Sequence, residues 1–333
     1  MDALLLFLNS LFLGTPVWFW LSFIAIVLVL LVLDLGVLHK KHTEIGVNES
    51  LKLSAFYITV GLAFGGWVWL ERGAQSGMEY LTGFVVEKTL AMDNIFVIAM
   101  IFSFFAIPRK YQHRVLFWGI LGVIILRGIM IGLGAALVSE FAWLLYVFAI
   151  FLIATGVKML IFADKEENPD LSQNPLLKFI KKHFKVTDEH HGEKFFVKKQ
   201  DEKTGKFATY MTPMFLALLL VEIADVIFAV DSVPAIFNIT TDTFIVYTSN
   251  IFAILGLRAL YFALAAMVER FKYLKYALAI LLIFIGSKVF VADLLGLDKF
   301  PPSLSLAITF AILAAGVFYS LYKTRNLKAQ NTD

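Results

Sequence analysis

Residues 221–237 read Val-Glu-Ile-Ala-Asp-Val-Ile-Phe-Ala-Val-Asp-Ser-Val-Pro-Ala-Ile-Phe. Apart from three carboxylates, a serine and a proline, this stretch is as apolar as a membrane-spanning helix. An ionisable side chain is costly in hydrocarbon, so carboxylates in such a helix indicate a functional site. The stretch therefore predicts a membrane helix that carries Glu222, Asp225 and Asp231 into a polar site.

A second stretch repeats this pattern. Residues 87–97 read Glu-Lys-Thr-Leu-Ala-Met-Asp-Asn-Ile-Phe-Val. In both stretches an acidic residue is followed six positions later by an aspartate and then by a neutral polar residue. The two sets are Glu87, Asp93 and Asn94, and Asp225, Asp231 and Ser232.

The repeat extends beyond these acidic residues. An arginine, a Gly-x-Lys motif and an aspartate follow each stretch in the same order. They are Arg127, Gly156-Val-Lys158 and Asp164 in the first half, and Arg258, Gly286-Ser-Lys288 and Asp293 in the second. This shared order aligns membrane spans three to five with spans six to eight. Because each unit has an odd number of spans, the second unit enters the membrane in the opposite orientation. The sequence thus predicts a three-plus-three inverted repeat, a plan common in secondary transporters.

Composition supports a membrane protein and excludes several functions. The chain has 333 residues, of which 59% are hydrophobic, and a mean hydropathy of +0.79. A net charge of +3 argues against nucleic acid as a partner. The absence of cysteine excludes disulfides, thiolate metal sites and thiol redox chemistry by this chain. No residue of the first sixteen is basic, so we expect no cleaved signal peptide. We expect the short apolar stretch Ala3–Leu13 to lie at the membrane surface.

Apolar stretches long enough to cross a membrane recur along the chain. They fall at roughly 17–38, 54–70, 82–106, 115–138, 141–163, 212–237, 243–268, 274–294 and 303–322. The predicted fold is therefore all-α, a polytopic membrane helix bundle of about nine transmembrane helices. Alternate connections are rich in Lys and Arg, which places the N-terminus outside and the C-terminus in the cytoplasm of an inner (plasma) membrane protein.

These spans divide the chain into five parts. They are N-terminal helices outside the repeat (1–81), the first repeat (82–163), a cytoplasmic loop (164–209), the second repeat (210–294), and the last helix with a cytoplasmic tail (295–333). In the loop, Phe195-Phe-Val-Lys-Lys and Lys206-Phe-Ala-Thr-Tyr-Met flank a turn and predict a β-hairpin.

Other polar residues in the spans also have predicted roles. Arg127 and Arg258 are predicted counter-charges, either in purely structural ion pairs or neutralising an empty site. Asp34, near the end of the first span, is a candidate ligand or pathway residue. We expect Lys88, Lys158 and Lys288 to extend toward the membrane surface. We expect Asn250 to join helices by hydrogen bonds.

The candidate ligands are all oxygens. Carboxylate, amide and hydroxyl oxygens suit Mn²⁺, Ca²⁺ or Mg²⁺, whereas Zn²⁺ and Cu⁺ sites would include sulfur or nitrogen. The predicted metal residues are Asp34, Glu87, Asp93, Asn94, Glu222, Asp225, Asp231 and Ser232. We expect no permanently bound cofactor and no enzymatic activity; a divalent cation, the lipid bilayer and H⁺ as counter-ion are the expected partners.

The two acidic motifs resemble those of the TerC family. Thr-Ser-Asn-Ile-Phe-Ala-Ile-Leu-Gly-Leu-Arg-Ala (248–259), Phe-Ile-Gly-Ser-Lys (284–288) and Phe-Phe-Val-Lys-Lys (195–199) strengthen the match, which is best to the Alx branch. The resemblance implies a multi-pass protein of the LysE-like transporter superfamily. It also implies export of Mn²⁺ through the acidic residues of spans three and six.

A second class of function stays open from the sequence. The Alx branch has been called a redox modulator, and the family name refers to tellurium resistance. The alternative is therefore a membrane component that transports nothing and modulates redox chemistry with partners. The residues alone do not decide between Mn²⁺ and Ca²⁺, or between H⁺ as counter-ion and membrane potential as the driving force. They also do not give the direction of transport or the oligomeric state.

Overall fold

The computed structural model describes residues 2–36, 47–161, 175–200, 207–264, 273–297 and 300–330. The helices are α1 (Asp2–Asn9), α2 (Val17–Gly36), α3 (Val47–Phe104), α4 (Arg109–Glu140), α5 (Leu144–Ile161), α6 (Pro175–His183), α7 (Pro213–Phe237), α8 (Thr243–Leu255), α9 (Leu257–Leu264), α10 (Leu274–Leu294) and α11 (Pro302–Gln330). The strands are β1 (Leu11–Phe12), β2 (Thr15–Pro16), β3 (Phe196–Gln200) and β4 (Phe207–Met211).

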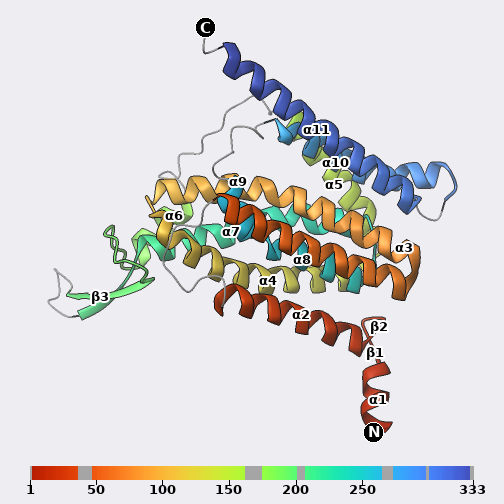
Figure 1. The fold of residues 1–333 in the computed structure, drawn as a ribbon, viewed down its shortest axis with the longest axis horizontal. Helices are drawn as coiled ribbons and strands as arrows, with labels where there is room; N and C mark the ends of the chain where they lie inside the picture. Colours follow the sequence, from red (N-terminus) through yellow and green to blue (C-terminus); the bar gives the residue numbers. More distant parts are fainter. Residues whose placement is uncertain are drawn as a thin grey trace.

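The bundle is built from long apolar helices. Within the described ranges, seven helices are long and apolar enough to cross a membrane, and Val17–Leu33 of α2 is a shorter apolar segment. The predicted all-α membrane bundle is therefore confirmed. Figure 1 shows α3, α4, α7 and α8 stacked in the middle of the bundle, with α2 on one side and the more steeply inclined α5, α10 and α11 on the other.

Helix α3 contains two antiparallel arms. Gly73 lies between them with φ 88° and ψ 172°, a backbone conformation that glycine adopts without strain. Beyond it the chain returns, and the Tyr80 hydroxyl donates to the Gly61 carbonyl at 3.0 Å. Glycine lets the arms approach closely, since a Cβ on Gly65 would lie 2.7 Å from the Tyr80 ring. The predicted span 54–70 falls in the first arm, and the predicted span 82–106 falls in the second except for its last two residues.

Helices α5 and α10 pack through two glycines in a reciprocal way. A Cβ on Gly156 of α5 would lie 2.6 Å from the Ala279 carbonyl oxygen of α10. A Cβ on Gly286 of α10 would lie 2.5 Å from the Ala149 carbonyl oxygen of α5. Each glycine thus meets the residue seven positions before the other glycine. Both glycines belong to the Gly-x-Lys motifs that correspond to each other in the two predicted repeats.

Helices α8 and α9 form one apolar segment that is broken at Gly256. Helix α8 ends at Leu255 with Gly256 as its C-cap, and α9 begins at Leu257. The sequence predicted a single span over 243–268. The break leaves the last carbonyls of α8 without helical partners, and these need other donors.

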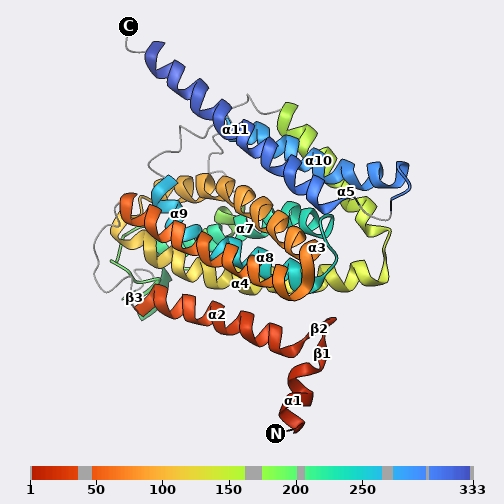
Figure 2. The same cartoon turned by 45° about the vertical axis from the view of Figure 1, so that its right-hand side comes forward.

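The long connection before α7 folds against one end of the bundle. Strands β3 and β4 pair antiparallel, which confirms the predicted hairpin. Helix α6 buries Leu177 and Ile180 against Leu216 of α7. Arg114 of α4 bonds Glu193 at 3.1 Å. In both views β3 lies at the opposite end of the bundle from α1 (Figure 1 and Figure 2).

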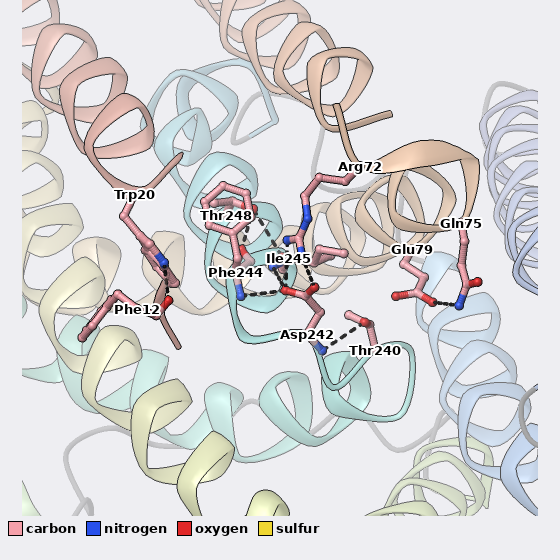
Figure 3. Close-up of polar contacts among 10 residues, drawn as sticks. All are labelled: Phe12, Trp20, Arg72, Gln75, Glu79, Thr240, Asp242, Phe244, Ile245 and Thr248. Carbon is pink, nitrogen blue, oxygen red and sulfur yellow. Dashed lines mark hydrogen bonds and ion pairs between the residues drawn. The ribbon is translucent and has the colours of Figure 1, made fainter. Parts of the chain in front are cut away.

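At the end of the bundle opposite β3, an arginine links α3 to the start of α8. Figure 3 shows Arg72, next to the turn of α3, extending to Asp242 at the start of α8. The Nη2–Oδ2 distance is 2.7 Å and the Nη1–Oδ1 distance is 3.3 Å. Asp242 also caps α8 by accepting from the backbone N–H of Phe244 at 3.0 Å. This end of α8 is therefore fixed to the turn of α3.

Candidate cation site

A single guanidinium at the centre of α4 links three helices. Arg127 is 1% exposed. Its Nε and Nη2 donate to Asp225 Oδ2 and Oδ1 of α7 at 3.0 and 2.8 Å. Its Nη1 donates to Glu87 Oε1 of α3. Two-point pairing with a carboxylate is the strong geometry for arginine, so this cluster fixes how α3, α4 and α7 lie around the site.

Neutral polar residues complete the cluster. Arg127 Nη1 also lies 3.2 Å from Ser232 Oγ and 3.3 Å from Asn250 Oδ1. Asn94 Nδ2 donates to Asp225 Oδ1 at 3.3 Å. The sequence predicted Ser232 and Asn94 as repeat equivalents, and both lie at this cluster. It interpreted Asn250 only as a link between helices, whereas the structure brings it to Arg127.

The cluster has more negative than positive charge. Two carboxylates, Glu87 at 0% and Asp225 at 6% exposure, meet one guanidinium. Glu87 Oε2 and Asn94 Oδ1 are buried and have no hydrogen-bond partner within the described part of the chain. Buried polar atoms are normally paired, so two unpaired oxygens beside these carboxylates favour a cation or a proton donor there.

A small cavity adjoins these unpaired oxygens. It measures about 70 Å³, and its polar wall consists of Glu87, Asn94, Arg127 and Ser232. Space of this size holds a water molecule or a small ion, since one water needs roughly 10–15 Å³ of such volume. Oxygen ligands and room for an ion therefore occur together.

A second cavity is also lined by Asn94. It measures about 30 Å³, and its polar wall is formed by Asn94, Asp225 and Arg258. Phe228 of α7 lines both this cavity and the one beside Glu87. Arg258 is 4% exposed. Both predicted counter-charges are thus buried at the acidic residues.

Glu222 occupies space left by glycines of α4. It lies one turn before Asp225, and a Cβ on Gly122 would overlap its carboxylate. A Cβ on Gly119 would lie 3.8 Å from Glu222 Oε1. Glu222 Oε2 is buried without a partner among the described residues. The structure thus places this predicted ligand between α4 and α7, one turn from the Arg127 cluster.

Two lysines differ from the prediction. Lys88 was expected to extend to the membrane surface, but it is 7% exposed and donates to the Ala253 carbonyl at 2.9 Å. This carbonyl lies in the last turn of α8, where the break at Gly256 creates a need for donors. Lys288 is 5% exposed and donates to Ser305 Oγ of α11 at 3.3 Å. Lys158 is exposed, as expected.

Three predicted ligands cannot be placed. The side chains of Asp34, Asp93 and Asp231 lie outside the described residues. Among the side chains that are described, no group of three or more His, Asp or Glu residues could hold a metal ion. In this conformation Arg127 is the cation that the Glu87 and Asp225 carboxylates bind.

The chain matches known membrane proteins over most of its length. Residues 72–328 match the model of a family described as the integral membrane protein TerC family. A Rickettsia bellii membrane protein of uncharacterized role is 49% identical over 304 residues, covering 91% of this chain and 97% of that protein. The Myxococcus xanthus membrane protein STKORF319 is 45% identical over 320 residues, covering 96% and 97%.

A further relative has a name that suggests a role. A Photorhabdus laumondii protein, named as a candidate membrane-bound redox modulator, Alx, is 42% identical over 327 residues. The match covers 96% of this chain and 98% of that protein. No solved structure matches the chain.

Proposed function

We propose, from the premise that this chain belongs to the TerC family of multi-pass integral membrane proteins, that it exports divalent metal cations, above all Mn²⁺. One observation carries the proposal. Two buried carboxylates share one guanidinium, and unpaired oxygens of Glu87 and Asn94 adjoin a cavity large enough for an ion. Carboxylate, amide and hydroxyl oxygens are the ligands of hard divalent cations.

In this mechanism Arg127 takes the place of the metal when the site is empty. A divalent cation that enters the cavity competes with the guanidinium for Glu87 and Asp225. Asn94 and Ser232 add neutral oxygens, and we include Asp93, Asp231 and Glu222 as further ligands along the path. When the metal leaves, Arg127 returns and neutralises the carboxylates, which spares the protein two unpaired buried charges.

The proposed architecture has nine spans. They are α2, the two arms of α3, α4, α5, α7, α8 with α9, α10 and α11. The reciprocal contacts of Gly156 and Gly286 support a three-plus-three inverted repeat, because a two-fold axis maps each contact onto the other. The basic connections then lie in the cytoplasm of an inner membrane protein, with the N-terminus outside and the C-terminus inside.

Purified protein in proteoliposomes gives the direct test. We expect flux of Mn²⁺, compared with Ca²⁺, Mg²⁺ and Zn²⁺ in parallel. Asn at Asp93, Asp225 or Asp231 should abolish it, and Glu87→Gln should impair it. Glu140→Gln, an exposed carboxylate at the end of α4, is the matched control and should transport normally. Full Mn²⁺ flux through properly inserted Asp225→Asn protein would show that the carboxylates are structural.

We include H⁺ as the counter-ion in this proposal. Metal binds carboxylates only in their ionised form, so metal and proton compete for the same oxygens. With the membrane potential clamped, flux at sub-saturating Mn²⁺ should rise with cytoplasmic pH between about 6 and 8.5, where perturbed carboxyl groups can titrate. If the Mn²⁺ flux does not change with pH, competition with protons at this site does not limit transport.

The names of relatives favour a second candidate, a redox modulator that acts with partners. The chain has no cysteine, so any such role would be indirect. Proteoliposomes distinguish the two, because a modulator without transport activity would carry none of the four metals.

A further inference from the structure

A third and larger cavity lies where α5, α7 and α10 end or begin. It measures about 260 Å³. Its polar wall consists of Tyr146, Asn238, Thr240, Thr241, Lys288 and Asp293. The sequence suggested no role for this set beyond the Gly-x-Lys motif and the aspartate that follows it. The proposed orientation places this cavity at the outer face, where the connections contain few basic residues.

Oxygen atoms dominate the polar wall. Asn238 is 8% exposed, and its Nδ2 donates to the Pro234 carbonyl at 2.9 Å, which fixes the amide. Its Oδ1 is buried and has no partner among the described residues. The Tyr146 side chain and the Asp293 carboxylate line the same cavity. An oriented amide oxygen and a carboxylate thus line the same space.

Several helices begin or end at this cavity. Helix α7 ends at Phe237 and α10 ends at Leu294, and residues of both last turns line the cavity. The C-terminal end of a helix carries a partial negative charge. Helix α5, which begins at Leu144, brings a positive end, and α8 and α11 begin within two residues of the lining residues Thr241 and Phe300. Lys288 supplies the one ammonium among the lining residues, and it is bonded to Ser305 at the wall.

The three cavities follow one another along α7. Asp225 and Phe228 line the cavity beside Arg258, Phe228 and Ser232 line the cavity beside Glu87, and the third cavity begins at Phe237. Phe237 comes five positions after Ser232, which is about 7.5 Å along a helix. A similar step of six positions occurs on α10, where Leu282 lines the cavity beside Glu87 and Lys288 lines the third cavity.

We infer that this cavity is a second, weaker binding site for the transported divalent cation, from which it leaves the protein. The inference rests on the proposed transport function and adds a site to it. Asp293 and Asn238 attract the cation after it leaves Glu87 and Asp225. The ammonium of Lys288 repels it, which keeps the site weak and favours release.

Electron paramagnetic resonance of Mn²⁺ tests this inference, because the signal of free hexaaqua Mn²⁺ falls as the ion binds. The probe is Mn²⁺ alone, titrated into the full chain in lipid nanodiscs. We expect two classes of site in the unaltered protein. Asp293→Asn should remove the weaker class and leave the tighter one unchanged. Glu87→Gln should weaken the tighter class instead.

Lys288→Met supplies a change in the opposite direction. Without the ammonium, the weaker class should bind Mn²⁺ about tenfold more tightly, since a like charge at the wall no longer opposes the ion. Met fills the volume of the lysine stem, so the wall is preserved. Glu140→Gln and Lys158→Met, at exposed positions outside the cavity, are controls and should change neither class.

The outcomes separate the two proposals. A single class of site that Asp293→Asn and Lys288→Met leave unchanged overturns the second site and keeps the first. A protein that binds no Mn²⁺ in any variant overturns both.

Discussion

Replacing Arg127 with Met tests whether the guanidinium takes the place of a transported cation. The change removes every hydrogen bond that this side chain donates to Glu87, Asp225, Ser232 and Asn250. Both carboxylates are left in a buried site with excess negative charge. Removing one partner of a buried pair costs about 3–5 kcal/mol. Without metal, we therefore expect a melting temperature many degrees below that of the unaltered protein.

The diagnostic result comes from adding metal. If Arg127 occupies the position of the cation, Mn²⁺ should stabilise Arg127→Met more than the unaltered protein, because no guanidinium competes for the carboxylates. Mn²⁺ at a hundred times its dissociation constant adds about 2.7 kcal/mol, which restores much of the loss. Thermal melts in detergent, with and without Mn²⁺, measure both effects.

Arg72→Met is the matched control. Arg72 also makes a two-point contact with a carboxylate, that of Asp242, but the two side chains are 20% and 27% exposed. Solvent screening limits such a pair to about 0–1 kcal/mol, so its loss should lower the melting temperature little and without dependence on metal. If Mn²⁺ stabilises Arg127→Met no more than it stabilises Arg72→Met, the interpretation of Arg127 as a substitute cation is wrong.

Two further predictions concern glycines. Gly122→Ala should reduce Mn²⁺ flux, because its Cβ overlaps Glu222; Gly66→Ala, which meets nothing within 4 Å, is the control, and equal flux from the two would contradict the prediction. Gly156→Ala and Gly286→Ala should each destabilise the protein by about 1–3 kcal/mol in thermal melts, because each Cβ meets a backbone carbonyl oxygen that cannot easily move. A clear difference between the two losses of stability would argue against equivalent packing of Gly156 and Gly286.

The sequence predicted most helices because their cause is local. A long apolar run must satisfy its own backbone in lipid, and the predicted span 274–294 matches α10 residue for residue. The break at Gly256 was not predicted, since α8 and α9 are continuous in hydropathy. The donor for the freed carbonyl of Ala253 comes from Lys88, which is 165 residues away in sequence.

The candidate site was predicted in composition and less well in its contacts. Duplicated motifs identified Glu87, Asn94, Asp225 and Ser232, and the structure brings all of them to Arg127 or its cavity. Which side chains meet across helices depends on the rotation of each helix about its axis and on its depth in the membrane. A single sequence does not specify either. Asn250 was therefore assigned only a general bonding role. Its neighbours Thr248 and Ser249, also buried, were the available signal that this helix faces polar surroundings.

The contact between α5 and α10 has the form of an isologous interface, in which residue i meets residue j and j meets i. Two separate copies of one short polypeptide would form such a contact if they inserted into the membrane in opposite orientations. If the proposed inverted repeat arose by gene duplication and fusion, Gly156 and Gly286 correspond to one ancestral glycine. In that case each copy could change alone after fusion, which would allow the two faces of the membrane to acquire different gates around a shared centre.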